Sequence, residues 1–169
     1  EHARDEYPRE SCGLIVDGAY LPCENKALSE DAHEPDNPDC RCKLCSFVID
    51  PQIALKYDGR IQMVLHSHPN GPIYPSRADG AAQLAMNVAW GLIALDEERT
   101  SDPLVWGGDT KIAPIIGREF MHFTSDCYTL IRDAFRLGKI ELEFQGIGSW
   151  PYPPIELPVA PRDDAWWEG

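Results

Sequence analysis

Residues 64–82 read VLHSHPNGPIYPSRADGAA, and this stretch restricts the possible fold more than any other part of the chain. An apolar run ends in two histidines that stand two positions apart, and Pro69 then ends the run. Ser76 precedes a segment in which Ala, Leu and Met recur at helical spacing. The stretch therefore predicts a strand, a short loop and a helix in direct succession.

The two histidines can form part of a metal site. Residues i and i+2 of a strand point to the same face, so His66 and His68 lie side by side while Ser67 faces away. Ser76 is expected to cap the helix, and Asp79 in its first turn can reach back toward the end of the strand. Two imidazoles and one carboxylate hold zinc and leave a fourth position for water, whose pKa falls to about 7. The alternatives are a surface histidine pair and a capping box without metal.

A zinc hydrolase also needs a base that takes a proton from water and passes it to the leaving group. Glu10, in RESCGLIV, lies just before an apolar run that is predicted to be a strand. A residue at the rim of an active site would lie in such a place. Taken alone, however, Glu10 is also explained as an ordinary exposed glutamate.

H-S-H-P followed by S-x-x-D, with seven residues between His68 and Ser76, resembles the JAMM motif of JAB/MPN metalloproteases. ESCGLIV is similar to the glutamate strand of that family. The resemblance implies that zinc is held by His66, His68 and Asp79. Glu10 would then act as general acid/base, and Ser76 would help to stabilise the oxyanion. The activity implied is zinc-dependent hydrolysis of amide bonds, often isopeptide or C-terminal peptide bonds of ubiquitin-like proteins.

The fold class implied is α/β, with a JAB/MPN-like (cytidine-deaminase-like) mixed sheet flanked by helices over residues 1–116. The order of elements along the chain agrees with a mixed α/β domain that ends near Gly117. Asp17-Gly18 is a favoured two-residue turn and predicts a hairpin. The other expected elements are a helix ending within 3–10, an acidic loop over 28–38, helices from Asp50 and over 76–89, and strands at 46–49, 61–68, 90–96 and 111–117.

Residues 117–169 have a different character. FTSDCYTLIRDAFRLGK predicts an amphipathic helix that opens at Thr124, Ser125 or Asp126 and places Cys127 at its N-terminus. The helix dipole favours a thiolate there, as a nucleophilic cysteine requires; a cysteine packed as a small apolar side chain is the alternative. DCYTL resembles the nucleophile helix of NlpC/P60 cysteine peptidases, which cut peptidoglycan stem peptides. Residues 117–169 are therefore expected to be the N-terminal part of a papain-like NlpC/P60 domain.

This second resemblance is incomplete. NlpC/P60 enzymes use a cysteine, a histidine and a third polar group, whereas here no histidine follows Cys127 and His122 precedes it. Five prolines between Pro151 and Pro161 exclude a regular helix or central strand, so an extended Pro-rich tail is predicted. We therefore expect a truncated second domain without thiol protease activity in this chain.

Three of the six cysteines crowd into CRCKLC, as Cys40, Cys42 and Cys45. With Cys23 or His33 as a fourth ligand, they could bind a second, structural zinc. The C-x-C spacing is unusual for structural zinc and favours reduced, partly exposed thiols instead. An iron–sulfur cluster is less expected than a zinc ion.

Charge and hydropathy limit the remaining functions. The net charge of −13 disfavours binding to nucleic acid and to anionic membranes, and no apolar run is long enough for a transmembrane helix. A JAB/MPN domain joined directly to an NlpC/P60 helix resembles the layout of phage tail assembly proteins. That layout implies a place in the virion tail, or in the host cytoplasm during assembly with reduced cysteines.

The partners implied by this layout are other phage tail-tip proteins. The substrate would be a peptide, a protein or a peptidoglycan peptide. Two alternatives stay open. One is a non-catalytic structural module of the tail tip, and the other is an adaptor for an NlpC/P60 peptidoglycan endopeptidase that uses Cys127.

Overall fold

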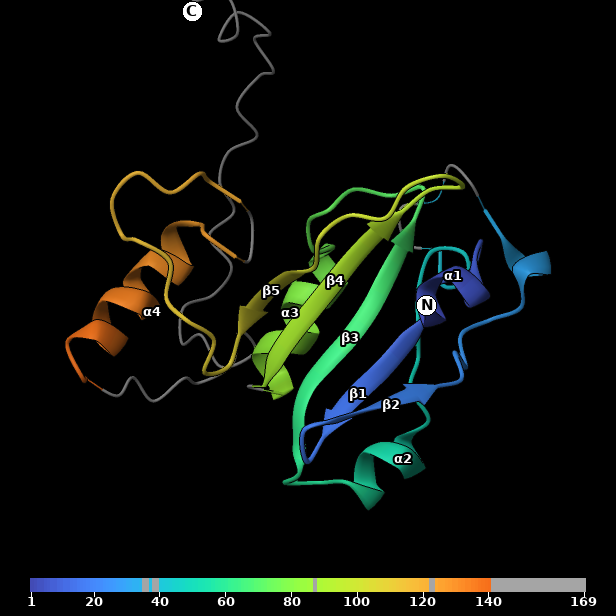
Figure 1. The fold of residues 1–169 in the computed structure, drawn as a ribbon, viewed down its shortest axis with the longest axis horizontal. Helices are drawn as coiled ribbons and strands as arrows, with labels where there is room; N and C mark the ends of the chain where they lie inside the picture. Colours follow the sequence, from blue (N-terminus) through green and yellow to red (C-terminus); the bar gives the residue numbers. More distant parts are fainter. Residues whose placement is uncertain (35–36, 38–39, 87, 122–123, 141–169) are drawn as a thin grey trace, which may run out of the picture.

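The computed structural model describes residues 1–34, 37, 40–86, 88–121 and 124–140; the predicted Pro-rich tail and His122 lie outside them. A five-stranded sheet in the order β2-β1-β3-β4-β5 forms its centre (Figure 1). Among the described strands, only β3 and β4 pair in parallel. The mixed α/β class is therefore confirmed. The strands are β1 (Cys12–Val16), β2 (Ala19–Cys23), β3 (Ile61–Pro69), β4 (Ala89–Leu95) and β5 (Leu104–Gly107).

β1 and β2 form the predicted hairpin. Asp17 and Gly18 both have positive φ, 50° and 80°, as a two-residue type I′ turn requires. The other edge of β1 pairs antiparallel with β3 and sets Cys12 opposite His66. This register brings the residues just before β1 to the level of His68, where the candidate site lies.

β3, α3 (Arg77–Met86) and β4 form a crossover unit. Two parallel strands need a connection that returns along the face of the sheet, and a helix provides it. The end of β3 and the start of α3 therefore meet at one edge of the sheet. The histidines of β3 and Asp79 of α3 are brought together there.

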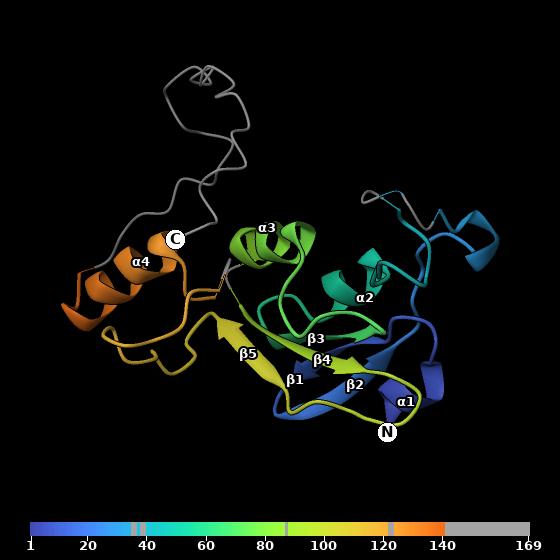
Figure 2. The ribbon, with the colours of Figure 1, turned by 90° about the horizontal axis from the view of Figure 1, so that it is seen from above.

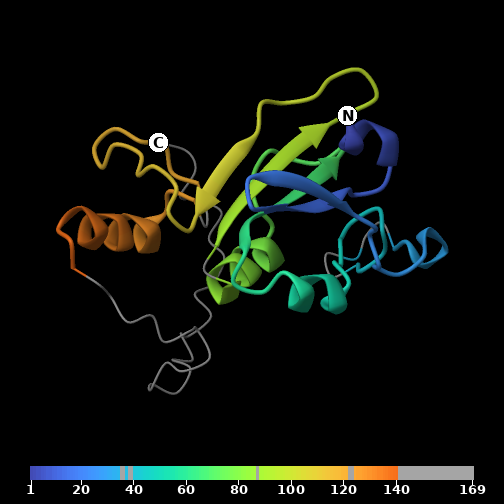
Figure 3. The same ribbon diagram turned by 60° about the horizontal axis from the view of Figure 1, so that its bottom comes forward.

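α2 (Pro51–Lys56) and α3 cover one face of the sheet, side by side (Figures 2 and 3). α1 (His2–Glu6) lies apart from them beside β4, where Arg4 donates a hydrogen bond to the carbonyl of Asp96. Among the described residues, an apolar core lies on the face of the sheet that the two helices cover. Its buried members are Cys12, Leu14, Val16, Cys23, Val64, Trp90, Leu92 and Trp106.

Two predicted strands are not found in the described residues. Residues 46–49 do not join the sheet, because the backbone of Val48 bonds to the side chain of Asn25 and the N–H of Lys26. Residues 111–117 lie past the edge strand β5 and are largely exposed. Pro114 lacks the N–H that a strand would offer to β5. In both places an apolar run is present but does not pair with an edge of the sheet.

α4 (Cys127–Leu137) is the predicted amphipathic helix, and it lies beyond β5 in Figure 1. Asp126 is its N-cap and accepts a hydrogen bond from the N–H of Thr129 at 2.9 Å. Asp133 on its buried side accepts a hydrogen bond from Arg118 at 2.7 Å. In the described part of the chain, no helix has both the length and the apolar character needed to cross a bilayer.

Candidate metal centre and groove

The carboxyl end of β3 presents both histidines on one face of the sheet. His66 and His68 are 3% and 9% exposed. Ser67 points to the other face, as the strand period predicts, and its hydroxyl accepts hydrogen bonds from the N–H and the hydroxyl of Ser11 at 2.8 and 3.0 Å. These two hydrogen bonds hold Ser11, which follows Glu10, against Ser67, which lies between the two histidines.

Asp79 reaches the same point from the first turn of α3. Its Oδ2 accepts a hydrogen bond from the N–H of Ser76 at 2.7 Å, while its own N–H donates to Oγ of Ser76 at 3.2 Å. This reciprocal pair is a capping arrangement at the start of the helix. The predicted cap and the predicted ligand are therefore one local structure, and the cap fixes where the carboxylate points.

The three side chains converge. Oδ2 of Asp79 lies 3.5 Å from Nε2 of His66 and 3.4 Å from Nε2 of His68. Zinc bonds to nitrogen and oxygen of about 2.0–2.2 Å, at a tetrahedral angle, place two ligand atoms about 3.3–3.5 Å apart. The ligand atoms of all three residues also lie within 4.8 Å of one another. The arrangement therefore has the dimensions of a three-ligand site for one ion.

The surroundings leave the right nitrogens available. Nδ1 of His68 lies 3.0 Å from the carbonyl oxygen of Pro72, which places the proton on Nδ1 and leaves Nε2 free to bind a metal. In the described part of the chain, the buried Nε2 of His66 has no hydrogen-bond partner. A buried polar atom without a partner is costly, and a metal ion at this point would satisfy it.

Burial and charge set the ionisation of these groups. Burial lowers the pKa of His66. Burial also acts to lower the pKa of His68, but Asp79 and Glu10 outweigh it and raise that pKa. Burial would raise the pKa of Asp79, yet the two imidazoles hold it well below its usual range. The lowered pKa of Asp79 favours its carboxylate and the lowered pKa of His66 favours its neutral imidazole, which are the forms that bind metals.

Glu10 is held beside these ligands. It is 6% exposed and lines the same groove as His68 and Asp79. Burial raises the pKa of its carboxyl to about 8, with His68 opposing and Asp79 adding to the rise. Its N–H donates to the carbonyl of Lys43 at 2.8 Å, and its carbonyl accepts from the side chain of Asn25 at 2.9 Å. The alternative of an ordinary exposed glutamate is therefore wrong.

A groove of about 640 Å³ extends from the site between α2 and α3. Small and flexible apolar side chains form its α3 wall, and Arg41 and Arg77 add positive charge. The α3 side chains are Ala78, Ala81, Ala82 and Met86. The groove thus combines apolar side chains with charged ones and with two of the candidate ligands, His68 and Asp79.

Two aromatic residues shape the site without being singled out by any sequence motif. Phe47 stacks on His66 with ring centroids 4.8 Å apart, and Trp90 meets the same imidazole edge-on at 5.7 Å. Trp90 belongs to an apolar strand, so its burial follows from the sequence. Phe47 lies in an irregular segment, and no periodic pattern in the sequence indicates its position.

Ser76 and Cys127 occupy different environments. Ser76 is exposed and lines the groove, and its Oγ accepts from Asp79 as described above. Cys127 is exposed at the first turn of α4 and is not among the described residues that line the groove. The structure therefore unites Ser76 with the metal centre but leaves Cys127 apart from it.

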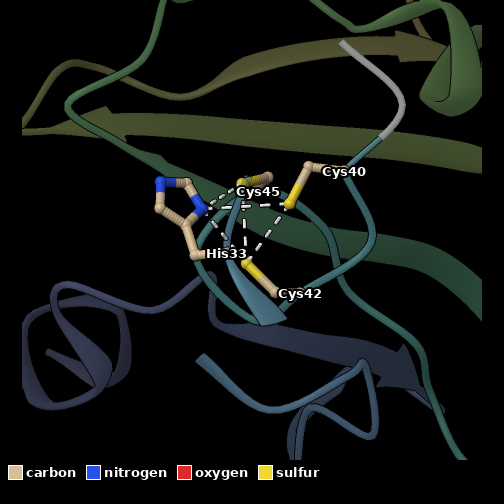
Figure 4. Close-up of side chains that lie close together, drawn as sticks. All are labelled: His33, Cys40, Cys42 and Cys45. Atoms are coloured by element: carbon tan, nitrogen blue, oxygen red, sulfur yellow. Dashed lines mark hydrogen bonds between the residues drawn. The ribbon is translucent and has the colours of Figure 1, made fainter. Parts of the chain in front are cut away.

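The cysteine-rich segment forms a second cluster. Cys40, Cys42 and Cys45 converge with His33 (Figure 4). Cys23, the other candidate for a fourth ligand, is buried in the core instead. The structure therefore places His33, and not Cys23, beside the three cysteines.

Known proteins resemble this chain in sequence. A family described as prokaryotic homologs of the JAB domain matches residues 1–106. The chain is 28% identical over 176 residues to tail tip assembly protein K of Escherichia phage N15, covering 99% of the chain and 64% of that protein. It is 30% identical over 109 residues to tail tip assembly protein K of Escherichia phage lambda, covering 64% of the chain and 43% of that protein. It is homologous to both and spans less than two thirds of either.

Two solution structures also match part of the fold. One is of a protein from Desulfitobacterium hafniense, with a TM-score of 0.38 and 24% identity, covering 64% of the chain and 77% of that protein. The other is of a protein from Salinibacter ruber, with a TM-score of 0.38 and 17% identity, covering 74% and 91%.

Proposed function

The chain belongs to the family of prokaryotic homologs of the JAB domain, and on that premise we propose that residues 1–106 form a zinc-dependent peptidase domain of a phage tail tip assembly protein. One observation carries the proposal. Two histidine nitrogens and one carboxylate oxygen are spaced as the ligands of a single tetrahedral ion, and a separate buried carboxyl lines the same groove. Metal-assisted hydrolysis of an amide bond uses both parts.

His66, His68 and Asp79 would hold the zinc. When bound, zinc acts as a Lewis acid and lowers the pKa of a water in its fourth position to about 7. The carbonyl of Pro72 keeps the proton on Nδ1 of His68 and so orients this ligand. The cap made by Ser76 fixes Asp79 in the same way.

Glu10 would move the proton. A cation held beside it would favour its ionised form, and the carboxylate could then take a proton from the attacking water and deliver it to the leaving amine as the amide bond breaks. Burial keeps this carboxyl away from bulk water, so the same group can act first as base and then as acid. Glu10 is not required as a ligand, because three ligands and one open position complete a catalytic zinc site.

Ser76 would stabilise the negative charge that develops on the carbonyl oxygen of the substrate. Its Oγ already accepts a hydrogen bond from Asp79, so the hydroxyl hydrogen is available to donate. A donor aimed at the developing oxyanion stabilises the transition state more than the ground state. The side chain is exposed at the groove, where a substrate carbonyl can reach it.

The groove favours an extended peptide as substrate. Its apolar α3 wall can receive apolar side chains, and Arg41 and Arg77 can bind a carboxylate of the substrate. Other tail proteins are the proposed partners and candidate substrates, because both relatives are named as tail tip assembly proteins. The competing proposal is a tail-tip module that keeps this site without using it.

Activity of a matched pair of proteins tests the proposal. Zinc-loaded wild type and Glu10→Gln are incubated with a mixed peptide library, and new termini are identified by mass spectrometry. We expect cleavage by the wild type and none above background by the variant, with equal zinc in both. Cleavage that is equal in the two proteins contradicts the proposed mechanism. A wild type that binds zinc and cleaves neither peptides nor isolated tail proteins supports the structural module.

We also propose that residues 117–169 are the N-terminal part of an NlpC/P60 cysteine peptidase domain. The supporting observation is Cys127, which is exposed at the first position of an amphipathic helix capped by Asp126. A longer chain that adds the part of the relatives that this chain does not cover, assayed on peptidoglycan with and without Cys127→Ala, tests this. Cleavage that persists in the variant contradicts it.

A further inference from the structure

A second set of ligand atoms converges in the segment between β2 and α2. Nδ1 of His33 lies 3.8, 3.4 and 3.2 Å from the sulfur atoms of Cys40, Cys42 and Cys45. The sulfur of Cys42 lies 3.5 Å from that of Cys40 and 3.6 Å from that of Cys45. Figure 4 shows the four side chains pointing toward one another. All four ligand atoms lie within 4.8 Å of one another.

These distances match a tetrahedral metal site. Zinc bonds of about 2.3 Å to sulfur and 2.0–2.1 Å to nitrogen give separations near 3.8 Å between sulfurs and 3.6 Å between sulfur and nitrogen. A disulfide would need sulfurs about 2.05 Å apart, and all six cysteines are free. Three thiolates and one imidazole are a closed ligand set of the kind that structural zinc uses.

The backbone around the cluster is already ordered. Leu28 donates to the carbonyl of Arg41 at 3.1 Å and accepts from the N–H of Lys43 at 2.9 Å, so the two sides of the segment are tied together. The N–H of Cys45 donates to the carbonyl of Cys42 at 3.1 Å, which forms the turn of the C-x-x-C part. These backbone bonds hold the turn that carries Cys42 and Cys45, and they do not depend on the side chains.

The cluster also adjoins the groove. The carbonyl of Lys43, between two of its cysteines, accepts the hydrogen bond from the N–H of Glu10. The side chain of Asn25 bridges the carbonyls of Glu10 and Ser46. Cys45, Ser46 and Phe47 line the groove itself. A constraint on the cysteine turn is thus a constraint on one wall of the groove and on the backbone of Glu10.

We propose that His33, Cys40, Cys42 and Cys45 bind a structural zinc ion that fixes the wall of the groove beside Glu10. The ion takes no part in chemistry, since four protein ligands leave no open position. The proposal does not depend on peptidase activity, because the ligand set and its contacts with the groove are independent of turnover.

Metal content of the full chain tests the site. The protein is purified under reducing, oxygen-free conditions with zinc, and bound metal is counted by native mass spectrometry. Cys42→Ser is expected to lose one zinc relative to the wild type. Cys127→Ser makes the same substitution at a cysteine outside the cluster and is expected to lose none. The same zinc count in wild type and Cys42→Ser overturns the proposal.

Cobalt distinguishes this site from the histidine–aspartate site. Only thiolate ligands give Co²⁺ a sulfur-to-metal charge-transfer absorption, so the wild type and His68→Ala should both show it. Absence of this absorption in cobalt-loaded wild type overturns the proposal without requiring any variant to fold.

His33→Ala changes an exposed residue and is expected to lose the zinc of the cluster while keeping the fold, as judged by circular dichroism.

Hydrogen exchange tests the link to the groove. The amide of Glu10 is expected to exchange faster in Cys42→Ser than in Cys127→Ser, because its acceptor on Lys43 is no longer held. The amide of Leu92, in the central strand β4, serves as a reference and should not change. Equal exchange of the Glu10 amide in both variants contradicts the role in fixing the groove wall.

Discussion

The two clusters of metal-binding side chains differ in how the chain builds them. One takes two ligands from β3 and one from α3, all buried, and leaves one side open to a groove. The other takes four ligands from an irregular segment and surrounds its centre. A strand and a helix fix the directions of their side chains. Three ligands are therefore enough to define the position of an ion in the first cluster. In the irregular segment, backbone hydrogen bonds hold the cysteine turn, and the ion would add the constraint that joins His33 to that turn.

The ligand types follow the same division. Nitrogen and oxygen ligands with an open position suit a zinc ion that takes part in hydrolysis, whereas thiolates in a closed set suit one that only holds the chain. Glu10, to which we assign the proton transfer, lines the groove onto which the first cluster opens. The following experiments separate the two clusters by the size of the effect that each change produces.

The largest effect is expected from Asp79→Ala. This change removes one of three ligands and leaves two buried imidazoles without their carboxylate, so both zinc at the first cluster and peptide hydrolysis should be lost. Zinc at the cysteine cluster should remain. Asp50→Ala is the matched control, because Asp50 also caps a helix but touches neither cluster. A variant that keeps the wild-type zinc count would show that Asp79 is not a ligand.

Glu10→Gln should have the next largest effect, on rate alone. Glutamine keeps the shape of the side chain but cannot transfer the proton, so turnover should fall by roughly 10²–10⁴-fold while both zinc ions stay bound. Turnover of a peptide found in the library screen and metal content are measured on the same samples. If this variant loses zinc as completely as Asp79→Ala, then Glu10 is a ligand and its assigned role is wrong.

Chelation should change the reactivity of the cysteines selectively. Removing zinc frees the thiolates of the cysteine cluster, of which Cys45 is exposed, so alkylation by iodoacetamide should become faster there. Cys12 should stay unreactive in the native protein, because burial raises its pKa to about 12 and it is fully enclosed. Peptide mapping after a short exposure measures both. Equal labelling of the cluster with and without chelator contradicts zinc ligation.

The smallest effect is expected from Ser76→Ala. It removes the acceptor for the N–H of Asp79, and loss of such a cap costs about 1 kcal/mol of unfolding free energy. Asp50→Ala removes the cap of α2 and should cost a similar amount. Denaturant unfolding compares the two. Zinc at the first cluster should persist in Ser76→Ala with a modest loss of rate, and loss of that zinc would mean that the cap is essential to the ligand.

The first cluster could be anticipated from the sequence, and the second only in part. His66, His68 and Asp79 lie on a strand and a helix whose periods determine where side chains point. The sequence leaves His33 and Cys23 as equal candidates for the fourth ligand beside the three cysteines. His33 lies in an irregular segment, where no regular repeat indicates which way a side chain points. The same limit explains Phe47, which stacks on His66 from outside any regular element.

The wrongly predicted strands have a related cause. An apolar run indicates burial, but a strand also requires a neighbouring edge with free N–H and C=O groups. The backbone N–H and C=O of Val48 are hydrogen-bonded to Asn25 and Lys26 instead of to a strand. No pattern in the sequence predicts these two partners. The buried position of Glu10 likewise depends on the register between β1 and β3. That register is visible only once the two strands are paired in the structure.

The hydrogen bond between Ser11 and Ser67 bears on the order in which the first strand docks and the metal binds during folding. These residues are 56 positions apart in the sequence, whereas the three proposed ligands fall within the single stretch 66–79. Closing a long loop costs more entropy than folding a short one. A growing or partly opened chain can thus bind its ion before the first strand has docked, and such a chain holds metal with no proton carrier beside it. Under the proposed mechanism, the competence to cut a bond would then require β1 to be docked on β3.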